Sequence, residues 1–231
     1  TPQAGAVINH LDLQQRHTSY PYSYIMGFLE YNSNLSLNYC KAHYTGNVLP
    51  YFIEQITYRY IGTDTPHHFA NCKSLSKIIF SAPFNQTSAV NMLRGLTCIK
   101  EIIGDFTSVT NGTSMFVYLT SPVNLGGCIL GSITTGTDMF WNSFICKYPT
   151  LGIIGGSCDY LFESNGYLTT IPSVNLSTAT ILSNWISTST RIIRRSLAYG
   201  TKVTHTYANQ LLETAALNEI FTNLGTANAG A

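Results

Sequence analysis

The sequence predicts an α+β fold, with a β-rich mixed core, one internal helix and a C-terminal αα-hairpin. Two observations support this prediction. Short segments rich in β-branched and aromatic residues, separated by Gly, Asn and Ser, are typical of strands joined by tight turns. Apolar residues also recur at helical spacing in three places. These patterns divide the chain into an N-terminal arm (1–17), the α+β core (18–172), a helical hairpin (173–225) and a flexible tail (226–231).

The core contains one internal helix and one strong turn signal. Apolar residues at helical spacing over 87–104, ended by Gly104, predict the helix. Asn111-Gly112 follows, and this pair suits a type I′ hairpin turn because both central residues need φ > 0. Asn111 also begins a glycosylation sequon. However, 18 Asn and 49 Ser or Thr among 231 residues produce about four sequons by chance, which is the number observed. Asn111 is therefore predicted first as a turn residue, and glycosylation stays open.

The C-terminal part changes character after Pro172. Apolar residues at helical spacing predict one helix over 177–199, ended by Gly200, and a second over 206–224, ended by Gly225. Two such helices pack either on the core or against copies from neighbouring subunits. For the second arrangement, the predicted interface residues are Trp185, Ile193, Leu212 and Phe221. No repeat of 20–50 residues is evident.

The surface is predicted to be polar but nearly uncharged. Charged residues make up 10% of the chain and the net charge is +1, whereas about 25% of residues are charged in an average domain. Hydroxyls, amides and phenols cost less to desolvate than Lys or Glu, so this composition favours close protein–protein contact. The 12 Lys and Arg are spread along the chain, which argues against a nucleic-acid partner. No apolar run is long enough to predict a transmembrane segment.

Six cysteines leave three alternatives open. An even count without C-x-x-C allows disulfides, and the low charge and high Ser and Thr content favour an oxidising location. The cysteines could instead be reduced and buried, as expected for Cys98 in the internal helix. A C-x2-H and H-x3-C set could also bind zinc, through Cys40, His43, His68 and Cys72. The disulfide candidates are Cys40, Cys72, Cys128, Cys146 and Cys158.

The sequence predicts no enzyme, no cofactor and no metal site. The best nucleophile segment is GGSCD at Gly155–Asp159, but it has neither a G-x-S-x-G elbow nor a recognisable His partner motif. We therefore expect a non-enzymatic structural or assembly subunit of an extracytoplasmic complex. Such a complex could be an envelope, secretion apparatus, filament or virion, built from copies of this chain or from other subunits. The alternatives are a secreted receptor- or glycan-binding module that uses exposed Tyr, and an enzyme that uses Cys158 or Ser157.

Overall fold

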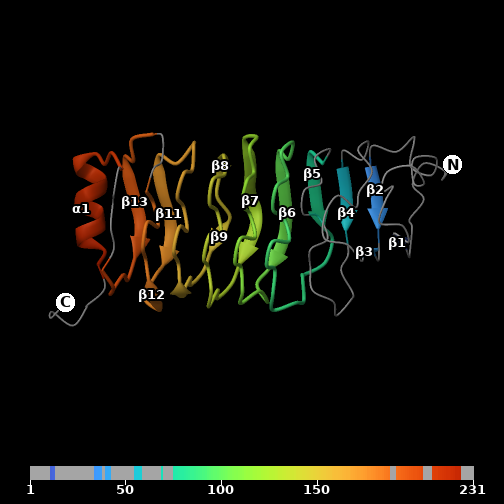
Figure 1. The fold of residues 1–231 in the computed structure, drawn as a ribbon, viewed down its shortest axis with the longest axis horizontal. Helices are drawn as coiled ribbons and strands as arrows, with labels where there is room; N and C mark the ends of the chain where they lie inside the picture. Colours follow the sequence, from blue (N-terminus) through green and yellow to red (C-terminus); the bar gives the residue numbers. More distant parts are fainter. Residues whose placement is uncertain are drawn as a thin grey trace, which may run out of the picture.

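The computed structural model describes residues 11–13, 34–37, 40–42, 55–58, 69, 75–187, 191–204 and 210–224. Figure 1 shows the strands as a row of arrows that run side by side, with a short helix at the C-terminal end. The elements are β1 (Leu11–Leu13), β2 (Asn34–Leu37), β3 (Cys40–Ala42), β4 (Gln55–Tyr58), β5 (Lys77–Phe80), β6 (Glu101–Phe106), β7 (Val123–Leu130), β8 (Ile145–Lys147), β9 (Thr150–Leu151), β10 (Gly156–Ser157), β11 (Thr170–Asn175), β12 (Ala179–Ile181), β13 (Arg195–Tyr199) and α1 (Thr214–Thr222).

Every strand pair in the described segments is parallel, which defines the architecture. The largest sheet has the order β2-β4-β5-β6-β7-β8, and β9 also pairs with β7. Its register joins Gln55 to Lys77, Lys77 to Glu101 and Glu101 to Asn124, in steps of 22, 24 and 23 residues. The chain therefore completes one coil in each of these steps, and each strand pairs with the strand one coil before it. Smaller parallel pairs, β10–β12 and β11–β13, continue this stacking of coils, so the fold is a β-solenoid and not a balanced α+β fold.

Each coil turns at a corner that begins with a residue in the left-handed backbone conformation, and in four of these coils a second such residue follows four positions later, at Gly95, Tyr118, Asn142 and Ser164. The φ values are 56°, 53°, 54°, 56° and 50° in successive coils, at Asn91, Ser114, Asp138, Tyr160 and Asn184. Two apolar residues follow each of these positions, in the tripeptides NML, SMF, DMF, YLF and NWI. This tripeptide recurs every 22–24 residues and is the repeat that the sequence analysis missed, because little else in the coils matches.

A ladder of large side chains fills the interior behind these corners. Phe116 stacks on Phe140 and Phe140 on Phe162, in both cases with ring centroids 5.4 Å apart and ring planes within 6° of parallel. Trp185, the second and not the third residue of its tripeptide, contacts Phe162 with its ring tilted and the ring centroids 6.3 Å apart. Backbone bonds run along the same line, for example from Phe140 N to Leu161 O at 3.1 Å. Equivalent residues of successive coils thus form both the core and the hydrogen-bond ladder, as in other repeat proteins.

The predicted internal helix and hairpin are both wrong. Within 87–104, the chain forms turns and a β-bridge and then enters β6 at Glu101. Ala89, Leu93, Leu96 and Ile99 of the expected apolar face are buried and Ile103 is half-buried, but these residues line a bent coil that mimics helical spacing. Neither Asn111 nor Gly112 has a positive φ, so no type I′ turn forms. Asn111 instead bridges in parallel to Ser88 and Thr135, and its Oδ1 accepts a hydrogen bond from Thr113 N at 3.1 Å.

The predicted C-terminal αα-hairpin is wrong as well. Its first helix is replaced by β12, a buried corner and β13. In β13 the odd-numbered residues are exposed, whereas Ser196 and Ala198 are buried, which is the two-residue period of a strand. Only α1 remains of the second helix. No helix in the described part of the chain is long and apolar enough to cross a membrane.

Candidate interaction surface at the C-terminal end

The helix α1 covers the last described strand of the solenoid (Figure 1). Its buried residues are Ala216 and Ile220, which lie one turn apart. The N-cap residue Glu213 makes no side-chain capping bond, the first turn holds no acidic residue and the last turn holds no basic residue. A nine-residue helix with such ends has little stability of its own, so its packing on the solenoid must hold it in place.

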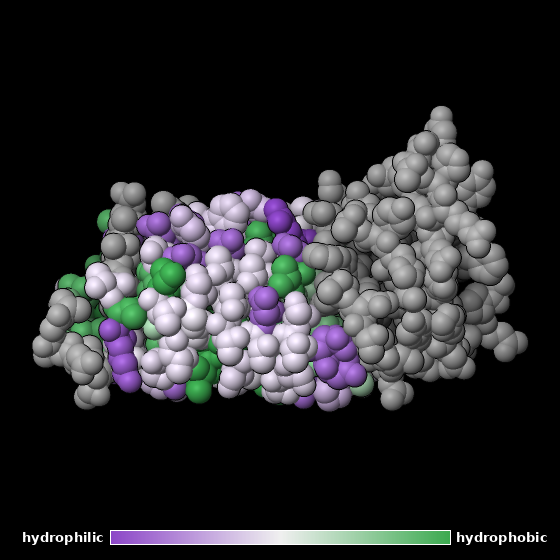
Figure 2. Space-filling model, turned by 60° about the horizontal axis from the view of Figure 1, so that its bottom comes forward, coloured by the Kyte–Doolittle hydropathy of each residue, from purple (hydrophilic) through white to green (hydrophobic). Residues whose placement is uncertain are grey.

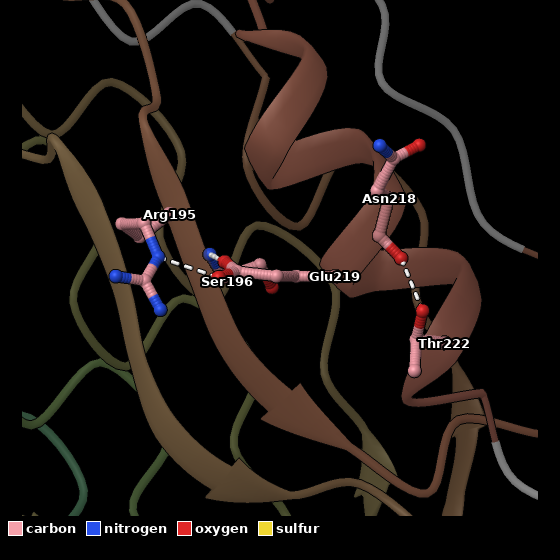
Figure 3. Close-up of polar contacts among 5 residues, drawn as sticks. All are labelled: Arg195, Ser196, Asn218, Glu219 and Thr222. Atoms are coloured by element: carbon pink, nitrogen blue, oxygen red, sulfur yellow. Dashed lines mark hydrogen bonds and ion pairs between the residues drawn. The ribbon is translucent and has the colours of Figure 1, made fainter.

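One carboxylate joins α1 to the edge of β13 (Figure 3). Glu219 Oε2 accepts a hydrogen bond from Ser196 N at 2.7 Å, and Oε1 accepts one from Arg195 Nε at 2.5 Å. The hydrogen bond from the Ser196 N–H is the largest cause of the lowered pKa of Glu219; desolvation opposes it, and the Arg195 guanidinium lowers the pKa further. The carboxylate therefore occupies a backbone donor that a further strand would otherwise use.

Backbone contacts and a second ion pair fasten the rest of the cap. Gly200 N donates to Asn223 O at 2.9 Å, and Ile193 N donates to Leu211 O at 2.9 Å. The Arg194 and Glu213 side chains are 3.4 Å apart and largely exposed, so their ion pair adds little stability. Glu219 is thus the side chain of the cap that directly occupies the β13 edge.

Solvent-exposed apolar side chains lie on α1 and just beyond its C-terminal end. Leu217, Phe221 and Leu224 are spaced by four and three residues, and Phe221 is 63% exposed. We call these three residues the C-terminal apolar stripe. Eight of the eleven large apolar side chains that are exposed in the described part belong to residues 181–224, namely Ile181, Ile192, Leu197, Tyr199, Leu211, Leu217, Phe221 and Leu224. Among the described residues, exposed apolar surface is therefore concentrated toward this end.

The middle coils have a different surface. Figure 2 shows a mostly pale face there, with few strongly hydrophobic or strongly hydrophilic residues. Some threonine hydroxyls bond to the neighbouring coil: Thr110 Oγ1 donates to Thr87 O at 3.2 Å, and Thr134 Oγ1 donates to Thr110 O at 3.1 Å. The predicted polar surface of low charge is thus partly used to join the coils.

A second surface feature is an aromatic corner. The Tyr118 ring lies 5.1 Å from Trp141, and the Arg94 guanidinium lies 5.3 Å from the Tyr118 ring centroid. Nearby along the chain, Arg191 lies 5.0 Å from the Tyr167 ring centroid. These arginine and ring faces contact one another from coil to coil, so stabilisation of the stack is their evident role.

The disulfide candidates are placed as follows. Cys128 and Cys158 are buried, Cys98 and Cys146 are exposed, and all four are free thiols, so the expected burial of Cys98 is wrong. Burial raises the pKa of both Cys128 and Cys158 to about 12, with Asp159 adding to the effect at Cys158. Cys40 belongs to β3, but its side chain and the other members of the zinc set, His43, His68 and Cys72, lie outside the described residues.

The GGSCD segment does not present an activated nucleophile. The Cys158 thiol is buried, donates to Gly155 O at 3.4 Å and stays protonated at neutral pH, whereas the thiolate is the reactive form. Ser157 Oγ accepts a hydrogen bond from Thr137 Oγ1 of the adjacent coil at 2.9 Å and donates one to Asp159 Oδ2 of its own coil at 3.5 Å. The second contact is longer than a usual O–H···O bond, and the same carboxylate also accepts a bond from Ser183 N at 3.0 Å.

The predicted interface residues fall into two groups. Trp185 and Ile193 are buried in the solenoid core, and Leu212 is partly buried against it. Phe221 alone of the four is exposed on the outer side of α1. The sequence analysis did not single out Leu217, Leu224 or Glu219. The i, i+4, i+7 spacing from Leu217 was a usable signal for the stripe, whereas the contact between Glu219 and β13 depends on tertiary structure.

The chain is a parallel β-solenoid whose C-terminal edge is covered by a short helix with an apolar outer side. No family model, curated protein or solved structure matches it.

Proposed function

We propose that this protein is a non-enzymatic structural or assembly subunit of an extracytoplasmic complex, and that its subunit contacts form at the C-terminal end of the solenoid. The observation that carries the proposal is the exposed C-terminal apolar stripe, Leu217, Phe221 and Leu224. An exposed group of aromatic and aliphatic side chains, here on α1 and just beyond its end at Thr222, is typical of the buried centre of an interface. The low charge of the chain supports the extracytoplasmic setting by composition only.

The stripe suits a contact whose centre is apolar and whose rim is polar. The neighbouring charges of the cap are already neutralised within the chain, because Glu219 pairs with Arg195 and Glu213 pairs with Arg194. A partner can therefore cover the stripe without leaving one of these charges unpaired, which would be costly. Phe221 is the expected anchor, because aromatic residues at the centre of an interface contribute most to affinity.

The test replaces Phe221 with Ser and compares it with Ile129→Ser, a control on the middle coils where Ile129 is 47% exposed. We expect Phe221→Ser to weaken self-association, or co-purification from the native source, by about tenfold to a hundredfold, as for an interface hot spot. Ile129→Ser should leave association unchanged. Light scattering over a concentration series measures both. An unaltered assembly in Phe221→Ser, with the fold intact by circular dichroism, would contradict the proposal.

A second candidate function is the binding module, which the aromatic corner of Tyr118 and Trp141 supports. The ligand of such a module would contact the edges of the aromatic rings. The ring faces are already used, because Tyr118 packs on Trp141 and arginine side chains lie over the rings of Tyr118 and Tyr167. Trp141→Ala should then abolish binding to a receptor or glycan, whereas Phe221→Ser should not. A titration followed by Trp fluorescence separates the two functions.

A further inference from the structure

The edge of β13 beneath the cap has a self-complementary pattern of side chains. Arg195, Leu197 and Tyr199 point outward, while Ser196 and Ala198 point into the core. If a second β13 runs antiparallel with Leu197 opposite Leu197 of the other copy, Arg195 lies opposite Tyr199. That register pairs two leucines at the two-fold axis and places a cation beside an aromatic ring on each side of it.

The backbone of β13 supports the same register. Ser196 N and Gly200 N point away from β11, because they donate to Glu219 and to Asn223 O of the cap. Strand alternation places the Ala198 N–H on this edge between them. With Leu197 opposite Leu197, Ser196 and Ala198 of the two copies would exchange N–H···O=C bonds as a hydrogen-bonded pair. The Ser196 hydroxyl, buried without a partner among the described residues, would lie beside this new pair.

The cap is attached in a way that allows it to be displaced. It lacks side-chain capping, buries Ala216 and Ile220 of its nine residues, and occupies the Ser196 N–H with a side chain and not with a strand. Native proteins cover a free sheet edge because such an edge pairs readily with another chain. The Gly200–Asn223 and Ile193–Leu211 backbone bonds fasten the two ends of this cover, and between them Glu219 protects the Ser196 N–H.

We propose that β13 is a docking edge for β13 of a second copy of this chain, in antiparallel two-fold pairing centred on Leu197, and that α1 blocks this edge through Glu219. The inference rests on the proposed role of the C-terminal end in assembly and specifies a second contact there. The apolar stripe forms its subunit contact while the cap covers β13, whereas the β13 edge pairs with a second copy only after the cap has moved away.

The first measurement is exchange of the Ser196 amide hydrogen in the full-length protein. Glu219→Ala removes both contacts of the carboxylate, and Glu219→Gln removes its charge but keeps its shape. We expect Ser196 exchange to be about tenfold faster in Glu219→Ala and to increase less in Glu219→Gln. Glu213→Ala is the matched control, because Glu213 belongs to the same cap but its side chain pairs with Arg194. Unchanged protection of Ser196 in Glu219→Ala would overturn the blocking role.

The second measurement tests the pairing and its register. In a Leu197→Cys background, mild oxidation should link two copies when Glu219 is also Ala, because directly opposite residues in a non-hydrogen-bonded pair suit a disulfide. Trypsin cuts after Arg195 and Lys202, so the product is two SCAYGTK peptides joined through position 197. We expect the linked peptide to be several times more abundant with Glu219→Ala than with Glu213→Ala or with Glu219 intact.

The outcomes separate this inference from the proposed function. Faster Ser196 exchange without the linked peptide would mean that the uncovered edge does not pair, which overturns the docking edge. Equal linkage whether or not Glu219 is present would overturn the role of α1 as a cover. If Phe221→Ser weakens assembly while either of these results holds, the proposed function stands and the further inference fails.

Discussion

The aromatic ladder provides a direct test of the stacked coils. Phe140 is fully buried between Phe116 and Phe162, with both centroid distances at 5.4 Å. Replacing it with Leu keeps most of the buried apolar volume but removes two ring stacks. A volume-conserving swap costs under about 1.5 kcal/mol, and each lost aromatic pair adds about 0.5–1.5 kcal/mol. We therefore expect Phe140→Leu to lower the free energy of unfolding by about 2 kcal/mol.

Double-mutant cycles make this prediction specific to the solenoid. Phe140 and Phe162 belong to adjacent coils, so the Leu variants at these two positions should couple by about 0.5–1.5 kcal/mol. Phe116 and Phe162 are separated by Phe140, so their Leu variants should add within about 0.5 kcal/mol. Urea unfolding followed by circular dichroism supplies the free energies. Strong coupling between Phe116 and Phe162, or none between Phe140 and Phe162, would refute the stacking order.

Three further predictions concern single side chains. The Tyr148 hydroxyl is buried with no partner in the described part of the chain, so Tyr148→Phe should stabilise the protein by about 1 kcal/mol, raising Tm by about 2–4 °C in calorimetry; a lower Tm would show a missed hydrogen bond. Exposed Cys146 should react with a thiol reagent at pH 8 in the folded protein, whereas Cys128 and Cys158, with pKa near 12, should react only on unfolding. Mass spectrometry after a labelling pulse measures the modification of each cysteine. Rapid labelling of Cys158 would reopen its role as a nucleophile. The pKa of Glu219 is lowered in the folded protein, so its contribution to the free energy of unfolding is present above its unfolded pKa of about 4.3 and is lost as the pH falls through its folded pKa. Glu219→Gln should therefore make Tm fall less steeply as the pH is lowered. Parallel curves of Tm against pH for the two proteins would contradict this.

Several features of the fold were available from the sequence. Most of the apolar residues predicted to be buried within 87–104 are buried, because burial follows from hydrophobicity whatever the backbone does, whereas Cys98 is exposed. The many β-branched and aromatic residues did indicate short strands. Of the predicted interface residues, Phe221 lies on the exposed outer side of a helix.

The backbone assignments failed where a bent coil imitates a helix. A coil that turns a corner buries residues three or four apart, as a helix does, so Trp185, Ile186 and Ile193 fit a helical pattern and are nonetheless core residues of a solenoid. Asn111-Gly112 matched a hairpin turn, but the strands before and after it, β6 and β7, pair in parallel as parts of successive coils, whereas a hairpin needs antiparallel pairing. Local propensity was overridden by tertiary pairing.

The sequence by itself determined the composition and local structure of this protein: few charges, many hydroxyl and amide side chains, short strands and enough apolar residues for a core. It also contained the tripeptide repeat at 91, 114, 138, 160 and 184, which is visible once the coils are aligned. Only the tertiary structure decided that these segments stack in parallel, and that Glu219 lies at the β13 edge. Parallel pairing joins residues more than 20 positions apart, and the cost of closing such long segments is recovered only when neighbouring coils pack on one another.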